Sequence, residues 1–455
     1  MAGRRQKITV GFVALGCPKN VVDSERMLAE IAQAGLPITT ETDNADVVVI
    51  NTCGFIAPAK AESLEAIRRA VQCKRRGAVK KVLVAGCLSE RMGPELFKEV
   101  DGIDAVIGLD QRDKIAEIIK KVFSTGYVGG DRDAGPNRPA PAISHHVLDD
   151  RCRLLITPPH WVYLRIGEGC NHRCSFCTIP AIRGPFRSKP AELVIAEAEE
   201  LVSAGAVELN VIAQDTTYYG RDFKQKTALP ALLKALEKID GLAWIRLMYM
   251  YPAEIDDALI ETIAASERIV HYLDIPIQHV NDGILKSMRR PDTKDKLHAL
   301  VEKLRKAMPD IVLRTTLMVG FPGETDRRFA ELVDFVEWAR FDALGCFEFY
   351  PESGTAAAQM PAQVPGPVKQ QRLEELMLTQ QAIAFEKNKS RIGGRVTCLV
   401  DSADEGLCRG RYYGQAPDID GVCIIESCSA GPGQFIDTAV TGTRDYDLVV
   451  KQMQN

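Results

Sequence analysis

The sequence contains no apolar run that could cross a membrane as a helix. No stretch of about 18 or more residues is continuously apolar, and a membrane-spanning helix needs roughly 20. The basic N-terminal residues 1–7 lead directly into a strand-like run, without the apolar region and cleavage site of a secretory signal peptide. We therefore expect a cytoplasmic protein that has no membrane partner.

The sequence also lacks a strong excess of either charge. It has 57 Lys and Arg residues against 61 Asp and Glu residues, which gives a net charge of −4 at pH 7. A nucleic-acid-binding chain usually carries a basic excess, and the global balance indicates none. Charged residues make up 26% and hydrophobic residues 46%, as in ordinary globular domains, and 455 residues suffice for more than one domain.

Cysteine is not scarce, although a cytoplasmic location disfavours disulfide bonds. The 13 cysteines therefore indicate metal or redox chemistry. Three of them, Cys170, Cys174 and Cys177, lie in one short stretch, separated first by three and then by two residues. The stretch follows the strand-like run 161–166, so it is predicted to be a loop at the C-terminal end of a strand, where α/β folds carry their chemistry.

The spacing of these three cysteines favours an iron–sulfur cluster. A disulfide would leave one thiol over, and a structural zinc site uses four ligands that usually come as two separated pairs. Three thiolates on one compact loop suit a cubane cluster, whose fourth iron then has no protein ligand. A zinc site with His172 as the fourth ligand, and buried thiols without a metal, are the alternatives.

Three strand-like runs near the N-terminus are each followed directly by a cysteine. The runs and their cysteines are residues 8–16 with Cys17, 46–52 with Cys53, and 81–86 with Cys87. Helical stretches separate the runs, which predicts a doubly wound, largely parallel sheet. Because parallel strands end at one shared edge, the three cysteines are expected to lie together at a second metal site. Coincidence is the alternative, since cysteine is often buried at strand ends.

Six further strand-like runs alternate with helical sequence in the middle of the chain. They are residues 161–166, 207–212, 243–248, 271–275, 311–319 and 343–349. Eight such units close a barrel, so six predict an open, partial (β/α)6 barrel. Polar side chains follow four of the runs, at residues 213–217, 276–279, 320–325 and 350–355, which indicates a ligand at the strand ends.

The C-terminal part predicts a small antiparallel β-barrel of the OB type. Its strand-like runs, separated by Gly- and Pro-containing turns, are residues 395–400, 407–413, 421–426 and 434–440. Residues 391–455 contain six basic and nine acidic side chains, a net charge of −3. A module that grips phosphates should be basic, so we expect no direct RNA binding by this barrel and a better fit to a basic protein.

The cysteine loop resembles the signature of the radical S-adenosylmethionine (SAM) superfamily. The resemblance rests on the C-x3-C-x2-C spacing and on Phe176 directly before the last cysteine. It implies that Cys170, Cys174 and Cys177 hold a 4Fe–4S cluster whose open iron binds SAM. An electron from such a cluster cleaves SAM to a 5′-deoxyadenosyl radical. By family position, the resemblance assigns Phe176 to the neighbourhood of the adenine and places Gln214, Asp215, Gln278 and Gly320 in the SAM pocket.

Nearly the whole chain resembles the radical SAM methylthiotransferases. The resemblance divides the chain into an N-terminal domain at residues 1–125, a linker at 126–155, the radical SAM core at 156–385 and a TRAM domain at 386–455. It also implies that Cys17, Cys53 and Cys87 hold an auxiliary 4Fe–4S cluster with one open iron. The auxiliary cluster would deliver sulfur, and a second SAM molecule would supply the methyl group.

Four short strings resemble the RimO branch of this family rather than the branch that modifies tRNA. They are residues 15–20, 185–188, 212–217 and 274–279. The resemblance implies transfer of a methylthio group to the β-carbon of an aspartate in the twelfth protein of the small ribosomal subunit, either free or assembled. It also implies an electron donor and a sulfur donor as partners. A tRNA adenosine methylthiotransferase and a non-catalytic iron–sulfur protein are the alternatives.

Overall fold

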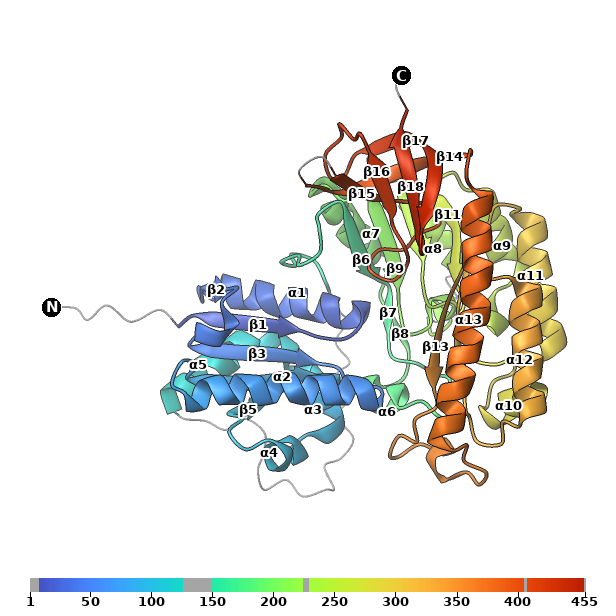
Figure 1. Cartoon of the computed structure of the whole chain (residues 1–455). Helices are drawn as coiled ribbons and strands as arrows, with labels where there is room; N and C mark the ends of the chain where they lie inside the picture. The colour runs from blue at the N-terminus through green and yellow to red at the C-terminus, as the bar shows by residue number, and fades with distance from the viewer. Residues whose placement is uncertain (1–7, 126–148, 224–228, 405–406, 454–455) are drawn as a thin grey trace. The chain divides into compact units, whose positions relative to one another are not determined.

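The structure of the chain, a computed structural model, describes residues 8–125, 149–223, 229–404 and 407–453 (Figure 1). Most of the predicted linker, residues 126–148, lies outside the described residues. The chain folds into two compact units. The first contains residues 1–156, 168–172 and 177–185, and the second contains residues 157–167, 173–176 and 186–455. The cysteine loop therefore contributes residues to both units.

The first unit is built on a five-stranded parallel sheet with the strand order β2-β1-β3-β4-β5 (Figure 1). The strands are β1 (Val10–Ala14), β2 (Ile38–Thr39), β3 (Val47–Thr52), β4 (Lys81–Gly86) and β5 (Ala105–Val106). In register, Val10 pairs with Val47, and Thr52 pairs with Gly86. The two-residue edge strand β2 was not predicted, because Ile38 and Thr39 are too few to form a recognisable strand pattern.

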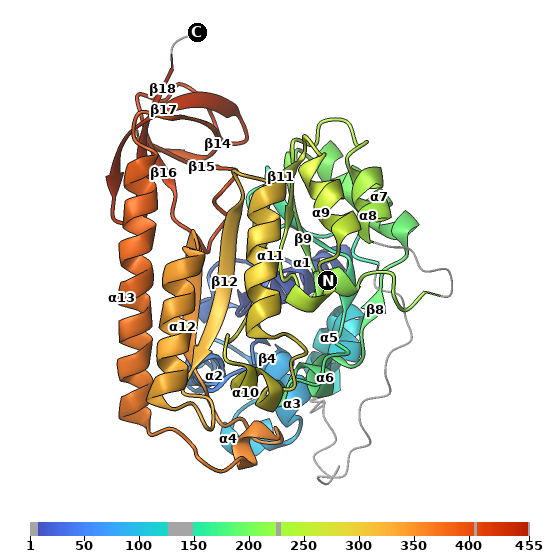
Figure 2. The same ribbon diagram turned by 90° about the vertical axis from the view of Figure 1, so that its right-hand side faces the viewer.

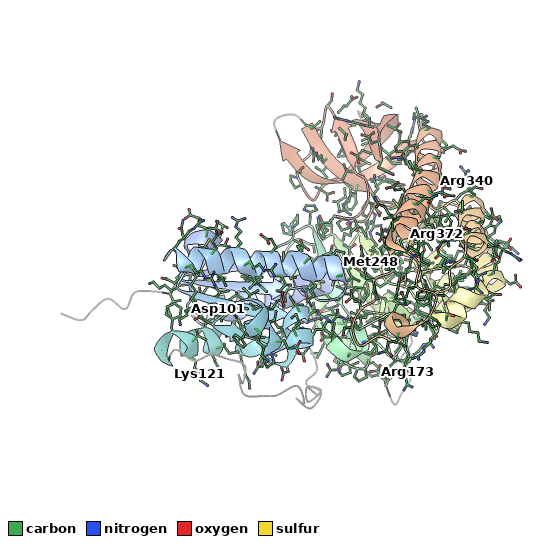
Figure 3. All side chains as sticks on the ribbon, turned by 60° about the horizontal axis from the view of Figure 1, so that its bottom comes forward. Asp101, Lys121, Arg173, Met248, Arg340 and Arg372 are labelled. Atoms are coloured by element: carbon green, nitrogen blue, oxygen red, sulfur yellow. The ribbon has the colours of Figure 1, made fainter. Side chains whose placement is uncertain are left out.

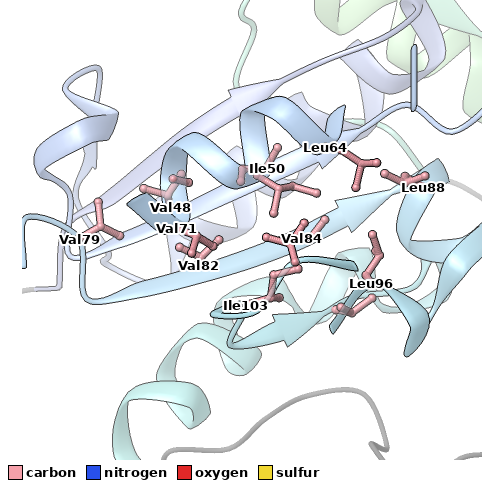
Figure 4. Packing of buried hydrophobic residues seen from close by; sticks show 14 of the residues in the cluster. Val48, Ile50, Leu64, Val71, Val79, Val82, Val84, Leu88, Leu96 and Ile103 are labelled. Carbon is pink, nitrogen blue, oxygen red and sulfur yellow. The ribbon is translucent and has the colours of Figure 1, made fainter. Parts of the chain in front are cut away.

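Helices cover both faces of this sheet. The helices of this unit are α1 (Pro18–Gln33), α2 (Ala57–Arg75), α3 (Cys87–Met92), α4 (Glu95–Glu99), α5 (Ile115–Thr125) and α6 (Ile179–Arg183), with short 3-10 turns η1 (Thr42–Asn44) and η2 (Leu109–Lys114). Successive strand residues point to opposite faces. Val48 and Ile50 accordingly pack with α2, α3 and α4 (Figure 4), whereas Val47 and Val49 pack with α1 and α5. The predicted doubly wound sheet is confirmed.

The second unit contains a six-stranded parallel sheet with the order β13-β12-β11-β10-β9-β6. Its strands are β6 (Trp161–Arg165), β9 (Glu208–Ile212), β10 (Trp244–Leu247), β11 (Ile269–Asp274), β12 (Val312–Val319) and β13 (Ala343–Glu348). All six predicted strands are present. The sheet runs from β6 at one edge to β13 at the other, which confirms the open, partial barrel.

Helices connect these strands, and α11, α12 and α13 stand in a row along the outside of the sheet (Figure 2). The helices are α7 (Ala191–Ser203), α8 (Leu229–Leu236), α9 (Asp257–Ala264), α10 (Asp282–Ser287), α11 (Lys294–Ala307), α12 (Asp326–Ala339) and α13 (Gly366–Ser390). Shorter elements are β7 (Gly167–Glu168), β8 (Arg187–Ser188), η3 (Thr216–Tyr218), η4 (Pro252–Glu254) and η5 (Ala357–Gln359). Side-chain N-caps begin several helices; for example, Asp256 accepts a hydrogen bond from the Leu259 amide of α9 at 2.9 Å.

The chain ends in a closed barrel with the order β14-β15-β16-β18-β17. The strands are β14 (Arg395–Asp404), β15 (Leu407–Tyr412), β16 (Cys423–Glu426), β17 (Phe435–Arg444) and β18 (Asp447–Gln452). Strand β18 was not predicted; it pairs antiparallel with β17 and parallel with β16, which closes the barrel. Cys398, Cys408 and Cys423 lie in the apolar barrel core.

Buried ion pairs join this barrel to the parallel sheet within the second unit. Glu208 at the start of β9 is fully buried and pairs with Arg246 of β10 at 2.8 Å and with Arg411 of β15 at 2.7 Å. Arg411 also pairs with Asp401 of β14 at 2.7 Å. The carboxylate of Glu208 therefore binds two guanidinium groups, one from the parallel sheet and one from the barrel.

Within the described parts of the chain, no helix combines the length and the apolar character that crossing a membrane requires.

Candidate functional site

Cys17, Cys53 and Cys87 follow β1, β3 and β4, three neighbouring strands of the first unit. Small residues allow these strand ends to approach one another. Gly16 has a φ of 100°, and a Cβ there would lie only 3.0 Å from the Cβ of Cys53. A Cβ at Gly54 would lie 2.8 Å from the Cα of Leu88, which follows Cys87. The structure thus brings the three predicted ligands to one sheet edge.

Polar side chains hold the loops that carry these cysteines. The amide Nδ2 of Asn20, a residue only 1% exposed, donates to the carbonyl oxygens of Leu15 and Thr52 at 2.9 Å each, which ties the end of β1 to the end of β3. The hydroxyl of Ser63 accepts a hydrogen bond from the Cys53 amide at 3.0 Å and donates to the Cys53 carbonyl at 2.8 Å. The backbone around the cysteines is therefore positioned by buried hydrogen bonds.

The thiol pKa values at this edge are shifted in different directions. Burial raises the pKa of Cys87 to about 11, even though the nearby charge of Arg183 acts in the opposite direction. Burial likewise raises the pKa of Cys53. For Cys17, burial is outweighed by the positive charges of Lys19 and Arg183 together with backbone hydrogen bonds, so its pKa is lowered. Bound iron would supply the positive charge that ionises all three thiols.

The three thiols at this edge are the type of donor that an iron–sulfur cluster uses. In the portion of the chain that the structure describes, no group of three or more His, Cys, Asp or Glu side chains is arranged to hold one metal ion. A cubane cluster offers a separate iron atom to each thiolate, so its ligands stand farther apart than the ligands of a single ion. The chemistry of three cysteines at one sheet edge fits such a group.

The predicted SAM-pocket residues follow β9, β11 and β12 of the second unit. Gln214 is half-buried, Gln278 is 8% exposed, and neither side-chain oxygen has a hydrogen-bond partner among the described residues. Gln278 also has a φ of 72°, which is rare for a residue with a side chain. Gly320, with a φ of 72°, sits against the side chain of Lys369, so a Cβ would not fit there. These positions present polar groups at the strand ends.

Two other predicted residues have local structural contacts. Asp215 is 2% exposed, and its side chain caps η3 by accepting a hydrogen bond from the Thr217 amide at 3.0 Å. Phe176 packs edge-on against Phe321, with ring centroids 6.5 Å apart, and belongs to an apolar cluster with Phe349. The aromatic side chain therefore forms part of an apolar wall at the C-terminal ends of the strands.

Several buried polar groups of the second unit were not predicted from the sequence. Asn210 within β9 is fully buried, and both polar atoms of its amide lack partners in the described structure. Arg290 donates to the Pro276 carbonyl at 2.9 Å, and its guanidinium carbon lies 4.3 Å from the ring centre of Tyr251. Burial raises the pKa of Cys174, against the effect of Arg290 and its hydrogen bond to the thiol. The sequence signal that could have identified Asn210 is a polar residue inside a largely apolar strand-like run.

Three family descriptions match this chain. Residues 164–336 match the Radical SAM superfamily, residues 9–108 match the uncharacterized protein family UPF0004, and residues 392–452 match the TRAM domain. The matches cover parts of both compact units and the closing barrel.

Full-length relatives are found among curated proteins. The chain is 44% identical over 445 residues to the "Ribosomal protein uS12 methylthiotransferase RimO" of Pelotomaculum thermopropionicum, covering 97% of this chain and 98% of the relative. It is 43% identical over 457 residues to the protein of the same name from Geobacter sulfurreducens, covering 99% of each. The protein of that name from Syntrophomonas wolfei is 41% identical over 444 residues, covering 97% and 99%.

Among solved structures, the chain resembles the radical S-adenosylmethionine methyltransferase TsrM from Kitasatospora setae. The TM-score is 0.57 at 14% sequence identity, and the match covers 94% of this chain and 82% of TsrM. At this identity the likeness concerns the fold alone.

Proposed function

The chain belongs to the RimO family of radical SAM methylthiotransferases, and from this premise we propose that it transfers a methylthio group to ribosomal protein uS12. The acceptor that we propose is the β-carbon of an aspartate. The observation that carries the proposal is the position of Cys17, Cys53 and Cys87 at the ends of three neighbouring parallel strands, in a chain that matches uS12 methylthiotransferases over its full length.

We propose that six cysteines hold two 4Fe–4S clusters. Cys170, Cys174 and Cys177 hold the cluster that binds SAM, and Cys17, Cys53 and Cys87 hold the auxiliary cluster. When bound, these groups supply the electron-transfer, radical and sulfur chemistry that protein side chains lack. The protein's own residues position the ligands: Asn20 and Ser63 fix the cysteine loops of the first unit through the hydrogen bonds described above.

The second unit supplies the proposed SAM pocket. SAM carries an ammonium, a carboxylate, ribose hydroxyls and an adenine, all of which need hydrogen-bond partners. Both amide atoms of Asn210 and the side-chain oxygens of Gln214 and Gln278 are buried without a partner in the described part of the chain, and a buried polar atom left unsatisfied is costly. Phe176 and Phe321 form an apolar wall at the same strand ends. These features support a polar ligand with an aromatic group.

Replacing Gln278 by leucine is expected to weaken SAM binding by about tenfold or more. Loss of one buried hydrogen-bonding group costs roughly 1–3 kcal/mol, and 1.4 kcal/mol is a factor of ten. Gln380→Leu is the matched control, because Gln380 of α13 is 3% exposed and its side-chain oxygen also lacks a partner among the described residues. Isothermal titration calorimetry measures the affinity of each variant for SAM. Equal SAM affinities of the two variants would show that Gln278 does not line the pocket.

The charge of the C-terminal barrel supports a protein substrate. Arg391, Arg411, Asp401 and Asp420 form ion pairs within the second unit. Two of these residues are basic and two are acidic. The remaining charged residues of 391–455 therefore still carry a net charge of −3. Such a module repels phosphates and attracts a basic partner. We therefore propose that the barrel does not bind RNA directly and favours a basic ribosomal protein, either free or in the assembled subunit.

The decisive experiment offers both substrates to the reconstituted enzyme. The protein is incubated anaerobically with SAM, dithionite and sulfide, together with either uS12 or unmodified tRNA, and both are weighed by mass spectrometry. We expect uS12 to gain the mass of one methylthio group in place of one hydrogen, while tRNA stays unchanged. A gain on tRNA alone would establish the other branch of the family. If SAM were cleaved while neither substrate was modified, the radical SAM activity would stand and the proposed substrate would be refuted.

The proposed reaction also needs partners that supply reducing electrons and sulfur. We propose a cytoplasmic electron donor and a cytoplasmic sulfur donor, because the acceptor protein is a component of the ribosome. In the experiment above, dithionite and sulfide take the places of these two donors.

A further inference from the structure

One buried arginine contacts a cysteine of the first unit. Arg183 is the last residue of α6, and its side chain is 2% exposed. Its Nη2 group lies 3.2 Å from the Sγ of Cys87 and donates to the Oδ1 of Asn20 at 2.8 Å. Asn20 also joins the loops after β1 and β3, as described above. The guanidinium therefore lies at the cysteine edge of the parallel sheet.

Two carboxylates hold this guanidinium in place. The Nη1 group of Arg183 pairs with Glu168 at 2.6 Å, and its Nη2 group pairs with Asp23 at 2.9 Å. Arg112 binds the same two carboxylates, at 3.2 Å to Glu168 and in a shorter contact to Asp23. The four side chains are between 1% and 10% exposed. Two positive and two negative charges thus form a buried and neutral quartet.

A buried arrangement of this kind is expensive to build. Removing charges from water costs several kcal/mol per ion in real proteins, and pairing recovers this only when the geometry is good. A guanidinium also remains charged at every working pH. The quartet therefore keeps one permanent positive charge beside Cys87, whose Sγ is one of three acceptors around the Nη2 group of Arg183. An ion pair that only stabilised the fold would not need to contact the sulfur of Cys87.

We propose that Arg183 raises the reduction potential of the cluster assigned to Cys17, Cys53 and Cys87, with Asp23 and Glu168 positioning it. This inference rests on the proposed function. The potential of an iron–sulfur cluster depends on net charge and on hydrogen bonds to its sulfur atoms. Reduction adds negative charge to the cluster, and a nearby cation stabilises the reduced form more than the oxidised form. Removing the cation therefore lowers the potential.

The test isolates the auxiliary cluster in the full-length chain. The variant C170A/C174A/C177A removes the other proposed cluster and serves as the parent, in which iron and sulfide are measured after reconstitution. Arg183→Gln, Arg183→Lys and Arg112→Gln are added separately, and each protein is titrated with a redox mediator while its reduced cluster is followed by electron paramagnetic resonance. Arg112→Gln is the matched control, because it loses bonds to the same carboxylates but keeps Arg183 beside Cys87.

We expect Arg183→Gln to change the oxidised-to-reduced ratio at a fixed potential by about tenfold in favour of the oxidised form, which is 59 mV for a one-electron couple. Arg183→Lys keeps the charge and should shift the ratio by less, and Arg112→Gln should shift it least. An unchanged ratio in Arg183→Gln would overturn the inference. If Arg183→Gln does not retain iron, the Arg183→Lys variant is compared with Arg112→Gln instead. Equal oxidised-to-reduced ratios in these two variants would then overturn the inference. A parent without any cluster would instead refute the auxiliary site itself.

Discussion

Replacement of Cys17 by alanine is expected to abolish methylthio transfer to uS12 while the reductive cleavage of SAM continues. Cys17 belongs to the three-cysteine edge of the first unit, whereas the proposed SAM-cleaving cluster uses Cys170, Cys174 and Cys177. Loss of one of three ligands removes the auxiliary cluster, so the iron content should fall by about half. Product analysis by mass spectrometry, together with 5′-deoxyadenosine and iron determination, measures all three quantities.

Cys73→Ala is the matched control for this experiment. Cys73 lies in α2 of the same unit, is half-buried, and packs against the apolar cluster on one face of the sheet. We expect its substitution to leave iron content and methylthio transfer close to those of the unmodified protein. If Cys17→Ala kept its full iron content and still modified uS12, the three cysteines at the sheet edge would not hold the sulfur-delivering cluster.

Replacement of Glu208 by alanine is expected to destabilise the second unit by about 3–5 kcal/mol, the usual cost of removing one partner from a buried ion pair. Glu208 is fully buried between Arg246 and Arg411, so its loss leaves two buried guanidinium groups without this carboxylate. Denaturant unfolding measures the effect. Trp161 and Trp244 report on this region by fluorescence, since Arg411 lies 5.9 Å from the Trp161 ring centre and Trp244 packs against Phe435 of the barrel.

A surface ion pair provides the comparison. Glu386 pairs with Arg340, which is labelled in Figure 3, at 2.9 Å, and the two side chains are 69% and 41% exposed. Glu386→Ala should change the free energy of unfolding by less than about 1 kcal/mol, because water screens exposed charges. If Glu208→Ala cost no more than Glu386→Ala, the buried pairs would not be what holds the barrel to the parallel sheet.

The sequence alone predicted the architecture and the candidate metal ligands because both depend on local patterns. Apolar, β-branched runs mark buried parallel strands. Each of the runs before Cys17, Cys53 and Cys87 became a strand, and these strands are neighbours in the sheet. The shared edge of parallel strands then follows from geometry. The C-x3-C-x2-C spacing required no tertiary information at all. Strands β2, β7, β8 and β18 were missed, the first three because they are only two residues long and β18 because it lies beyond the last strand that the pattern suggested.

Only the tertiary structure revealed which buried charges meet. Arg183 pairs with Asp23 across 160 residues, and Arg411 pairs with Glu208 across 203 residues. Neither pairing leaves a mark in the sequence around either residue, because hydrophobic periodicity reports which face of a strand or helix is buried and not which side chain lies opposite. The partner of a buried charge is chosen by the packing of distant elements. The sequence thus determined where the cysteines are placed, and the fold decided which charges surround them.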